Sequence, residues 1–305
     1  MSSVSPIADP VVARLQALPR PLLWVIAARV KTLSLSLVPV LAGSWMAAGS
    51  GAWRPDVALA AGGASAAIQI GTNLWNDAAD AASGVDGPNR LGPPRLTSMG
   101  LLEAAQVRRA AAGAFGIAGL LGLYLVLLGG WPIVVIGVMS LALGFFYSMG
   151  PRPLSGTPLG ELLVVAFFGV VAVAGTTYLH GQPVTGDVLF LGAVVGLPAA
   201  AILLINNHRD RETDYLAGRR TLAILIGPAL SRATYVVLLA LTVLGAFAFA
   251  PCAIALVPVV VLAGILSFLM MKTPVSSALN RLIPGTALFQ LLVLLAVVAG
   301  RVFCG

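Results

Sequence analysis

The chain has 305 residues, of which 59% are hydrophobic and only 10% are charged, and its formal net charge is +7. This composition excludes an ordinary soluble domain, and the basic excess lacks the aromatic-interleaved patches of a nucleic-acid binder. Apolar runs of about twenty residues recur, each long enough to cross the ~30 Å hydrocarbon layer of a bilayer as a helix. The sequence therefore predicts an all-α polytopic membrane protein that contacts lipid and binds no nucleic acid.

In chain order, residues 1–21 carry a few charges and lack a long apolar segment followed by a cleavage site, so we expect a cytoplasmic tail and no signal peptide. The remainder, 22–305, is predicted to be a single transmembrane domain. Polar or Gly/Pro-rich turns divide it into nine predicted helices. These are residues 22–49, 57–80, 103–127, 131–149, 159–179, 188–207, 230–250, 252–271 and 284–303.

The Lys and Arg residues are distributed asymmetrically about these helices. Sixteen of the eighteen lie in the amino-terminal segment or near the connections that follow the even-numbered helices, and only Arg54 and Arg301 lie on the other side. Basic residues are retained on the cytoplasmic side of short loops. We therefore expect the amino terminus to face the cytoplasm and the carboxyl terminus to face outward.

Cysteine and histidine give little indication of chemistry. Cys252 and Cys304 lie in apolar segments near the predicted outer face, without a Cys/His cluster for a metal centre, so we expect both to be separate packing residues. His180 falls in a predicted outer loop, where we expect it to be solvated. His208 lies in a polar stretch and is a candidate for substrate contact.

Two polar stretches, residues 73–86 and 206–220, hold six of the eleven acidic residues. A helix brings residues three and four apart onto one face. Both stretches have this spacing, and both lie at predicted cytoplasmic helix ends. The residues that share a face are Asn73, Asn76, Asp77 and Asp80 in the first stretch, and Asn207, Asp210 and Asp214 in the second.

Clustered carboxylates at the edge of a bilayer require compensation by a cation or by water. Solvated charges are common at cytoplasmic helix ends, so one such motif alone would carry little weight. Two motifs with matched spacing favour a functional site. Because their ligands are hard oxygens without His or Cys, they point to Mg²⁺, which is usually held by a few carboxylates together with substrate phosphate oxygens.

Longer motifs give a family resemblance. NDAADAASGVDGPNRLGPPR at 76–95, YSMGPRPLSGTPLGEL at 147–162 and NNHRDRETDYLAGRRTLAILIG at 206–227 resemble the UbiA superfamily of intramembrane prenyltransferases. Within it, they are most similar to the MenA type, the 1,4-dihydroxy-2-naphthoate polyprenyltransferases of menaquinone biosynthesis. Two departures are mild: Val30 stands where the family often has proline, and Arg219 stands where lysine is common.

The resemblance implies a nine-helix bundle around a lipid-accessible cavity, in a bacterial-type inner membrane, with the active site facing the cytoplasm. It implies Mg²⁺-dependent transfer of a polyprenyl group from an allylic diphosphate to 1,4-dihydroxy-2-naphthoate, with loss of CO₂ and diphosphate, giving demethylmenaquinone. The implied metal contacts are Asn76, Asp77, Asp80, Asp86, Asn207, Asp210 and Asp214, of which Asp77, Asp80, Asp210 and Asp214 are the catalytic residues. The implied diphosphate contacts are Lys31, Asn76, Arg95, Arg152, Asn207 and Arg209.

Aromatic side chains are candidates for stabilising an allylic carbocation through their π faces. Tyr147 is the one that we assign to the substrate site. Tyr178, Phe167 and Phe168 are better explained by packing or by position at the membrane interface.

Two alternatives stay open at this point. A transporter or channel would use buried Asp and Asn residues to bind a cation or relay protons. A UbiA-type enzyme with another aromatic acceptor, or a cyclase without an acceptor, would share every metal-site prediction. Prenyl chain length and oligomeric state are not readable from the sequence.

Overall fold

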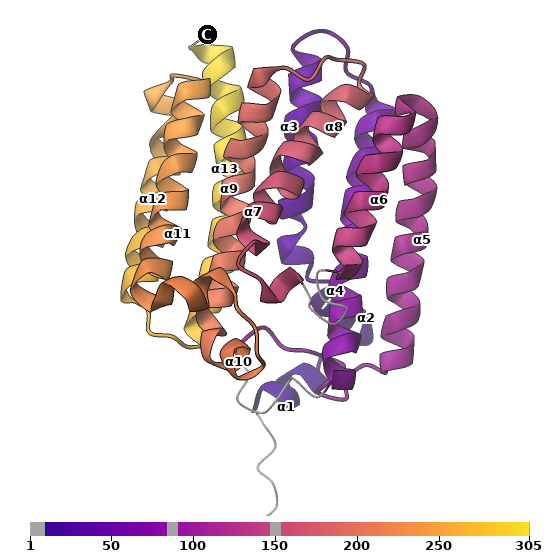
Figure 1. The fold of residues 1–305 in the computed structure, drawn as a ribbon, viewed down its shortest axis with the longest axis vertical. Coiled ribbons are helices and arrows are strands. Elements are labelled where there is room, and N and C mark those ends of the chain that lie inside the picture. Colours follow the sequence, from indigo (N-terminus) through magenta and orange to yellow (C-terminus); the bar gives the residue numbers. More distant parts are fainter. Residues whose placement is uncertain (1–9, 84–90, 147–153, 305) are drawn as a thin grey trace, which may run out of the picture.

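The computed structural model describes residues 10–83, 91–146 and 154–304, and the regular secondary structure in these ranges is entirely helical (Figure 1). The long helices run roughly parallel or antiparallel to one another. The shorter elements are α1 (Pro10–Gln16), α2 (Arg20–Ala27), η1 (Val30–Thr32), η2 (Leu154–Gly156), α7 (Gly160–Val165), η3 (Ala166–Val171), α8 (Ala172–Leu179), α10 (Arg211–Leu216) and η4 (Ser277–Arg281). The longer ones are α3 (Ser34–Ala48), α4 (Pro55–Ser83), α5 (Ala104–Gly129), α6 (Trp131–Phe146), α9 (Gly186–Arg209), α11 (Leu222–Phe249), α12 (Ala253–Lys272) and α13 (Leu282–Phe303).

The prediction of an all-α polytopic membrane protein is confirmed. Within the described ranges, seven helical segments are long and apolar enough to cross a membrane, and an eighth span results if the bent pair Arg20–Thr32 and Ser34–Ala48 is one crossing. The remaining apolar helix, α6, has 16 residues. Helix length and composition therefore support seven or eight spans and do not establish the predicted nine.

The predicted first span, 22–49, is broken near its start. The two parts meet at an angle of 50°, and Arg29 between them adopts the left-handed conformation, with φ 54° and ψ 47°. No other non-glycine residue in the described parts of the chain has a positive φ. The prediction missed this break because the apolar run is continuous, and hydropathy does not report backbone direction.

The amino-terminal segment packs against the bundle. Within residues 1–21, the predicted cytoplasmic tail, Pro10–Gln16 is helical, and Leu15 is buried in a cluster with Leu23, Leu74 and Leu96. Burying a leucine side chain contributes about 1.5–3 kcal/mol, so this contact holds α1 against α2, α4 and the segment after α4. Helix α1 thus lies beside the end of α4 that carries the first polar stretch.

The middle of the bundle contains an unusually close contact between two helices. A Cβ atom added at Gly169 of η3 would lie 2.4 Å from the carbonyl oxygen of Gly192 in α9, and one added at Gly196 would lie 2.9 Å from the carbonyl oxygen of Val165. Segment η3 is a π-helix, a form that often occurs at functional sites. Glycine therefore permits the backbone approach that holds η3 in place.

Two expectations are wrong at the opposite end of the bundle from α10. Cys252 and Cys304 form a disulfide that joins the start of α12 to the end of α13. His180 is buried: its Nδ1 accepts the backbone N–H of Arg54 at 3.1 Å, and its Nε2 lies 3.1 Å from Oγ of Ser44. Both errors have one cause, which is that the partner lies far away in the sequence. The two cysteines are 52 residues apart, and His180 is more than 120 residues from its partners.

Candidate active site

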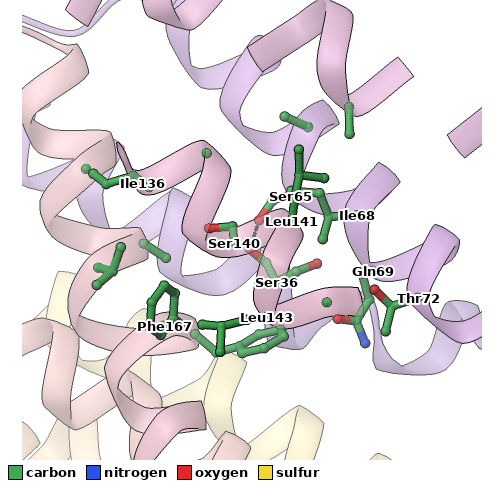
Figure 2. Close-up of a pocket in the computed structure, with 18 of the residues that line it drawn as sticks. Ser36, Ser65, Ile68, Gln69, Thr72, Ile136, Ser140, Leu141, Leu143 and Phe167 are labelled. Atoms are coloured by element: carbon green, nitrogen blue, oxygen red, sulfur yellow. Dashed lines mark hydrogen bonds between the residues drawn. The ribbon is translucent and has the colours of Figure 1, made fainter. Parts of the chain in front are cut away.

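A cavity of about 690 Å³ lies between α3, α4, α5, α6, η3 and α9. Most of its wall is apolar and includes Phe168 of η3 and its neighbour Phe167, which Figure 2 shows. Polar side chains are concentrated toward the end of the bundle that carries α10, where Arg29, Asn73, Asn76 and Asn206 line it. The cavity thus combines a polar mouth with an apolar interior, as a ligand with a charged head and a hydrocarbon tail requires.

The first polar stretch occupies the last turns of α4. Asn73 donates from Nδ2 to the carbonyl oxygen of Ala28 at 3.0 Å, which ties α4 to the broken first span. Asp77 is buried, and its Oδ2 accepts from the backbone N–H of Thr97 at 3.4 Å and from its hydroxyl at 3.0 Å. The other oxygen of Asp77 and Oδ1 of Asn76 are buried without a hydrogen-bond partner in the described part of the chain.

The second polar stretch is organised by Arg209, which is buried. Its guanidinium forms two hydrogen bonds to Asp210, at 2.8 and 2.5 Å, and donates to Oδ1 of Asn206 at 2.8 Å and to Oδ1 of Asn280 at 2.6 Å. Asn280 in turn donates to the carbonyl oxygen of Leu91 at 2.9 Å. Arg209 holds the second stretch together through these bonds, and its predicted contact with the diphosphate stays a prediction.

Asn207 and Asp214 point to other partners. Asn207 donates from Nδ2 to Oε1 of Glu161 at 2.9 Å, and both residues are buried. Asp214 accepts from Arg219 at 2.9 Å. Burial raises the pKa of Asp214, and the positive charge of Arg219 acts in the opposite direction. Neither Asn207 nor Asp214 lines the cavity; Asn206 does.

The structure places the other predicted residues as follows. Arg95 is buried close enough to Asp77 for its charge to act on that carboxylate, whereas Lys31 is exposed.

Tyr178 donates to the carbonyl oxygen of Gly129, consistent with the expected packing role. His208 is fully buried but does not line the cavity. Asp86, Tyr147, Arg152 and the side chain of Asp80 lie outside the described residues.

Sequence reasoning missed several residues at or near the site. Arg29 lines the cavity, and its left-handed backbone is a feature that the sequence does not reveal. Glu161 stands alone in an apolar run, and an isolated carboxylate in a predicted span was the signal that could have identified it. Gln69 and Thr72 continue the helical spacing of the first polar stretch toward the membrane interior, and both line the cavity.

The residues fit a magnesium site that the substrate completes. No group of three His, Cys, Asp or Glu side chains that could hold a metal ion occurs in the described ranges. The unpartnered oxygens of Asn76 and Asp77 are nevertheless hard donors on adjacent residues. Mg²⁺ is usually bound by one or two carboxylates plus substrate phosphates, so a small protein donor set suits this ion.

Comparisons with known proteins identify relatives of this chain. The 1,4-dihydroxy-2-naphthoate octaprenyltransferase of Mycobacterium tuberculosis is 36% identical over 220 residues, covering 71% of this chain and 74% of that protein. The Escherichia coli protein of the same name is 32% identical over 230 residues, covering 73% and 75%.

The structure of a UbiA homolog from Archaeoglobus fulgidus bound to GPP and Mg²⁺ has the same fold. Its TM-score is 0.62 at 14% sequence identity, and the match covers 91% of this chain and 98% of that one. Residues 36–299 match the sequence profile of the UbiA prenyltransferase family. The chain therefore belongs to the UbiA prenyltransferase family.

Proposed function

We propose that this protein transfers a polyprenyl group from an allylic diphosphate to 1,4-dihydroxy-2-naphthoate. The observation that carries the acceptor assignment is its similarity to 1,4-dihydroxy-2-naphthoate octaprenyltransferases over more than 70% of its length. The cavity supports the same assignment, because a polar mouth and an apolar interior match a prenyl diphosphate.

Bond making and breaking balance without an external base. The C–O bond of the allylic diphosphate breaks, and its electron pair leaves with the diphosphate. The ring carbon that bears the carboxylate forms the new C–C bond. Loss of CO₂ then returns an electron pair to the ring and restores its aromaticity. The product is the reduced form of demethylmenaquinone.

The chain's residues bind the diphosphate and exclude water from the cation. Asn76 presents an oxygen at the cavity mouth, Asp77 beside it on α4 has a buried unpartnered oxygen, and Asp80, Asp86, Asn207, Asp210 and Asp214 are proposed to extend this set in the substrate complex. Mg²⁺ bound there would neutralise charge on the leaving diphosphate. Arg29 and Arg95 supply positive charge beside the same end, and the apolar wall protects an allylic cation from hydrolysis.

We also infer that the polar mouth faces the cytoplasm of a bacterial cell. The asymmetry of Lys and Arg supports this orientation. The Cys252–Cys304 disulfide supports it independently, because it lies at the opposite end of the bundle and disulfides persist in oxidising compartments such as the periplasm.

Mass analysis of the products tests the proposal. The purified protein in lipid nanodiscs receives Mg²⁺, farnesyl diphosphate and 1,4-dihydroxy-2-naphthoate. We expect a decarboxylated farnesyl naphthalenediol that disappears with EDTA and falls at least about a hundredfold in Asp80→Ala and Asp214→Ala. Asp187→Ala is the matched control, because Asp187 is exposed at the other end of α9.

Each alternative has its own result in this experiment. Diphosphate release without the naphthalenediol product would assign the chain to another acceptor or to cyclisation. No consumption of prenyl diphosphate with any acceptor would refute prenyl transfer and favour a transporter. The cavity wall argues against a pathway for ions across the membrane. The polar side chains of α4 stop at Ser65, and the next lining residues on this helix are Ala64 and Ala61.

A further inference from the structure

A stripe of polar side chains follows one face of α4 into the apolar part of the cavity. Its members are Ser65, Gln69, Thr72 and Asn76, which are spaced by three or four residues and all line the cavity. Figure 2 shows Gln69 and Thr72 near each other on α4, with Ile68 on the same helix and Leu143 and Phe167 on other parts of the wall. Uncharged polar groups thus lie where the surrounding wall is hydrocarbon.

The hydroxyl of Thr72 lacks the bond that other helical threonines make. Thr176, Thr242 and Thr286 each donate to the carbonyl oxygen four residues earlier, at 2.7 to 2.8 Å. Oγ1 of Thr72 is buried and has no partner in the described part of the chain. This hydroxyl faces Gly144 of α6, where an added Cβ would lie 3.1 Å from it. Leaving such a group unsatisfied costs about 1–3 kcal/mol, so a ligand hydroxyl that displaces this packing and bonds to it would recover free energy.

Helix geometry places this hydroxyl at the correct depth for the second substrate. Thr72 is one turn, about 6 Å, from Asn76 along the axis, and Gln69 is about 10 Å from it. In the proposed function the diphosphate binds at the end of α4, and its allylic carbon would then lie roughly one helical turn into the cavity. The attacked ring carbon must approach that carbon to ~3–3.5 Å. An aromatic acceptor that meets this condition would lie alongside Thr72 and Gln69.

We propose that Thr72 and Gln69 form the acceptor site and bind the two ring hydroxyl groups of a dihydroxy aromatic acid. This inference rests on the proposed function and adds the residues that select its acceptor. Thr72, nearer the diphosphate, binds the hydroxyl next to the attacked carbon, and Gln69 binds the para hydroxyl. Side chains three residues apart on a helix have Cβ atoms about 5–6 Å apart, comparable with the separation of para oxygens on one ring. Neutral partners suit hydroxyl groups in this apolar surrounding, where a charge would be costly.

Steady-state kinetics of Thr72→Val and Gln69→Met test the site. Both changes remove hydrogen-bonding atoms and keep most of the volume. We expect each to raise KM for 1,4-dihydroxy-2-naphthoate about tenfold while KM for farnesyl diphosphate changes less than about twofold. Thr72→Ser, which restores the hydroxyl, should bring KM back. Thr242→Val is the matched control, since Thr242 is buried in α11, outside the cavity, with its hydroxyl already bonded to Leu238.

Inhibitors that lack one hydroxyl identify which group each residue binds. For 4-hydroxy-2-naphthoate, which lacks the hydroxyl next to the carboxylate-bearing carbon, Thr72→Val should leave the inhibition constant unchanged, whereas Gln69→Met should raise it. For 1-hydroxy-2-naphthoate, which lacks the para hydroxyl, Thr72→Val should raise the inhibition constant and Gln69→Met should leave it unchanged.

Equal increases in KM for both substrates, or an unchanged KM for the acceptor, would overturn the acceptor site while leaving prenyl transfer intact. The same would follow if each variant weakened both inhibitors equally. A wild-type protein that makes no product from 1,4-dihydroxy-2-naphthoate would instead refute the proposed function, whatever the variants do.

Discussion

At the scale of single residues, the buried Glu161 orients the side-chain amide of Asn207. Its carboxylate accepts from the amide nitrogen of Asn207 at 2.9 Å, and its second oxygen has no partner in the described ranges. A carboxylate accepts hydrogen bonds and so takes the NH₂ side of the amide, which leaves Oδ1 of Asn207 as the atom available to a cation. Groups that orient metal ligands in this way commonly affect metal affinity 10–100-fold.

We therefore predict that Glu161→Leu raises the Mg²⁺ concentration needed for half-maximal activity by at least about tenfold. Glu161→Gln should have a much smaller effect, because the glutamine carbonyl can still accept from Asn207. The checks are a Mg²⁺ titration and a Mn²⁺ binding measurement by electron paramagnetic resonance. If Glu161→Leu folds and its metal affinity is unchanged, Glu161 does not position Asn207 for the ion.

At the other end of the bundle, His180 is expected to make the stability of the fold depend on pH. Burial lowers the pKa of His180; the charge of Arg54 acts in the same direction, and that of Asp56 opposes both. The unfolded chain therefore binds this proton more readily than the folded one. Stability contributed here is present above the unfolded pKa of about 6.5 and is lost as pH falls below it.

Accordingly, the melting temperature of the wild type should fall between pH 7.5 and pH 5.5 by more than that of His180→Asn. Asparagine keeps a side-chain acceptor for the backbone N–H of Arg54 and does not titrate. Thermal denaturation in detergent at the two pH values provides the comparison. Identical pH dependence in the two proteins would show that His180 does not titrate in this range.

At the scale of elements, the contact between η3 and α9 positions one wall of the cavity. Segment η3 carries Phe167 and Phe168, and its backbone approaches α9 at Gly169, Gly192 and Gly196. The backbone atoms in this contact cannot move aside as a flexible side chain could. Glycine at these positions therefore controls where the aromatic side chains lie in the cavity.

Gly169→Ala should destabilise the protein and lower its activity, since the added methyl group would lie 2.4 Å from the carbonyl oxygen of Gly192. We expect a cost of about 1–3 kcal/mol, the usual range for overpacking. Gly113→Ala is the control: a Cβ there meets open space, and alanine is favoured over glycine in a helix by roughly 0.5–1 kcal/mol. Thermal denaturation of both variants in detergent measures the difference. Equal melting temperatures for Gly169→Ala and Gly113→Ala would contradict the packing argument.

At the scale of the whole molecule, the disulfide joins the last two long helices, α12 and α13, at one end of the bundle. Cys252 and Cys304 are the only two cysteines in the sequence, so thiol chemistry reports on this bond alone. Loop closure over 52 residues gives an upper limit of about 4 kcal/mol for its stabilisation. The actual value should be smaller, because α12 and α13 stay helical in the membrane.

Maleimide–polyethylene glycol should label the protein in intact cells only after reduction, adding two equivalents. The reduced protein, and the Cys252→Ser/Cys304→Ser variant, should melt at a lower temperature than the oxidised wild type. If the reduced protein were labelled only after cell lysis, this end would not face outward, and that support for the proposed orientation would be removed.

The sequence alone determined the membrane class, most helix positions and the two polar stretches, because these depend on local composition and on helical periodicity. It also indicated the family, since the motifs around Asp77 and Asp210 are contiguous. Asn73, Asn76 and Asp77 were expected to lie on one face of a helix end, and Asn73 and Asn76 do line the cavity there.

The tertiary structure decided which side chains meet. It showed that Asn206 lines the cavity while Asn207 binds Glu161, that Arg209 organises the second stretch, and that Cys252 and Cys304 are bonded. It also revealed the break at Arg29 and the unpartnered hydroxyl of Thr72. The physical reason is common to all of these: they depend on backbone direction or on partners far apart in the chain, and neither leaves a periodic or local signal in an apolar sequence.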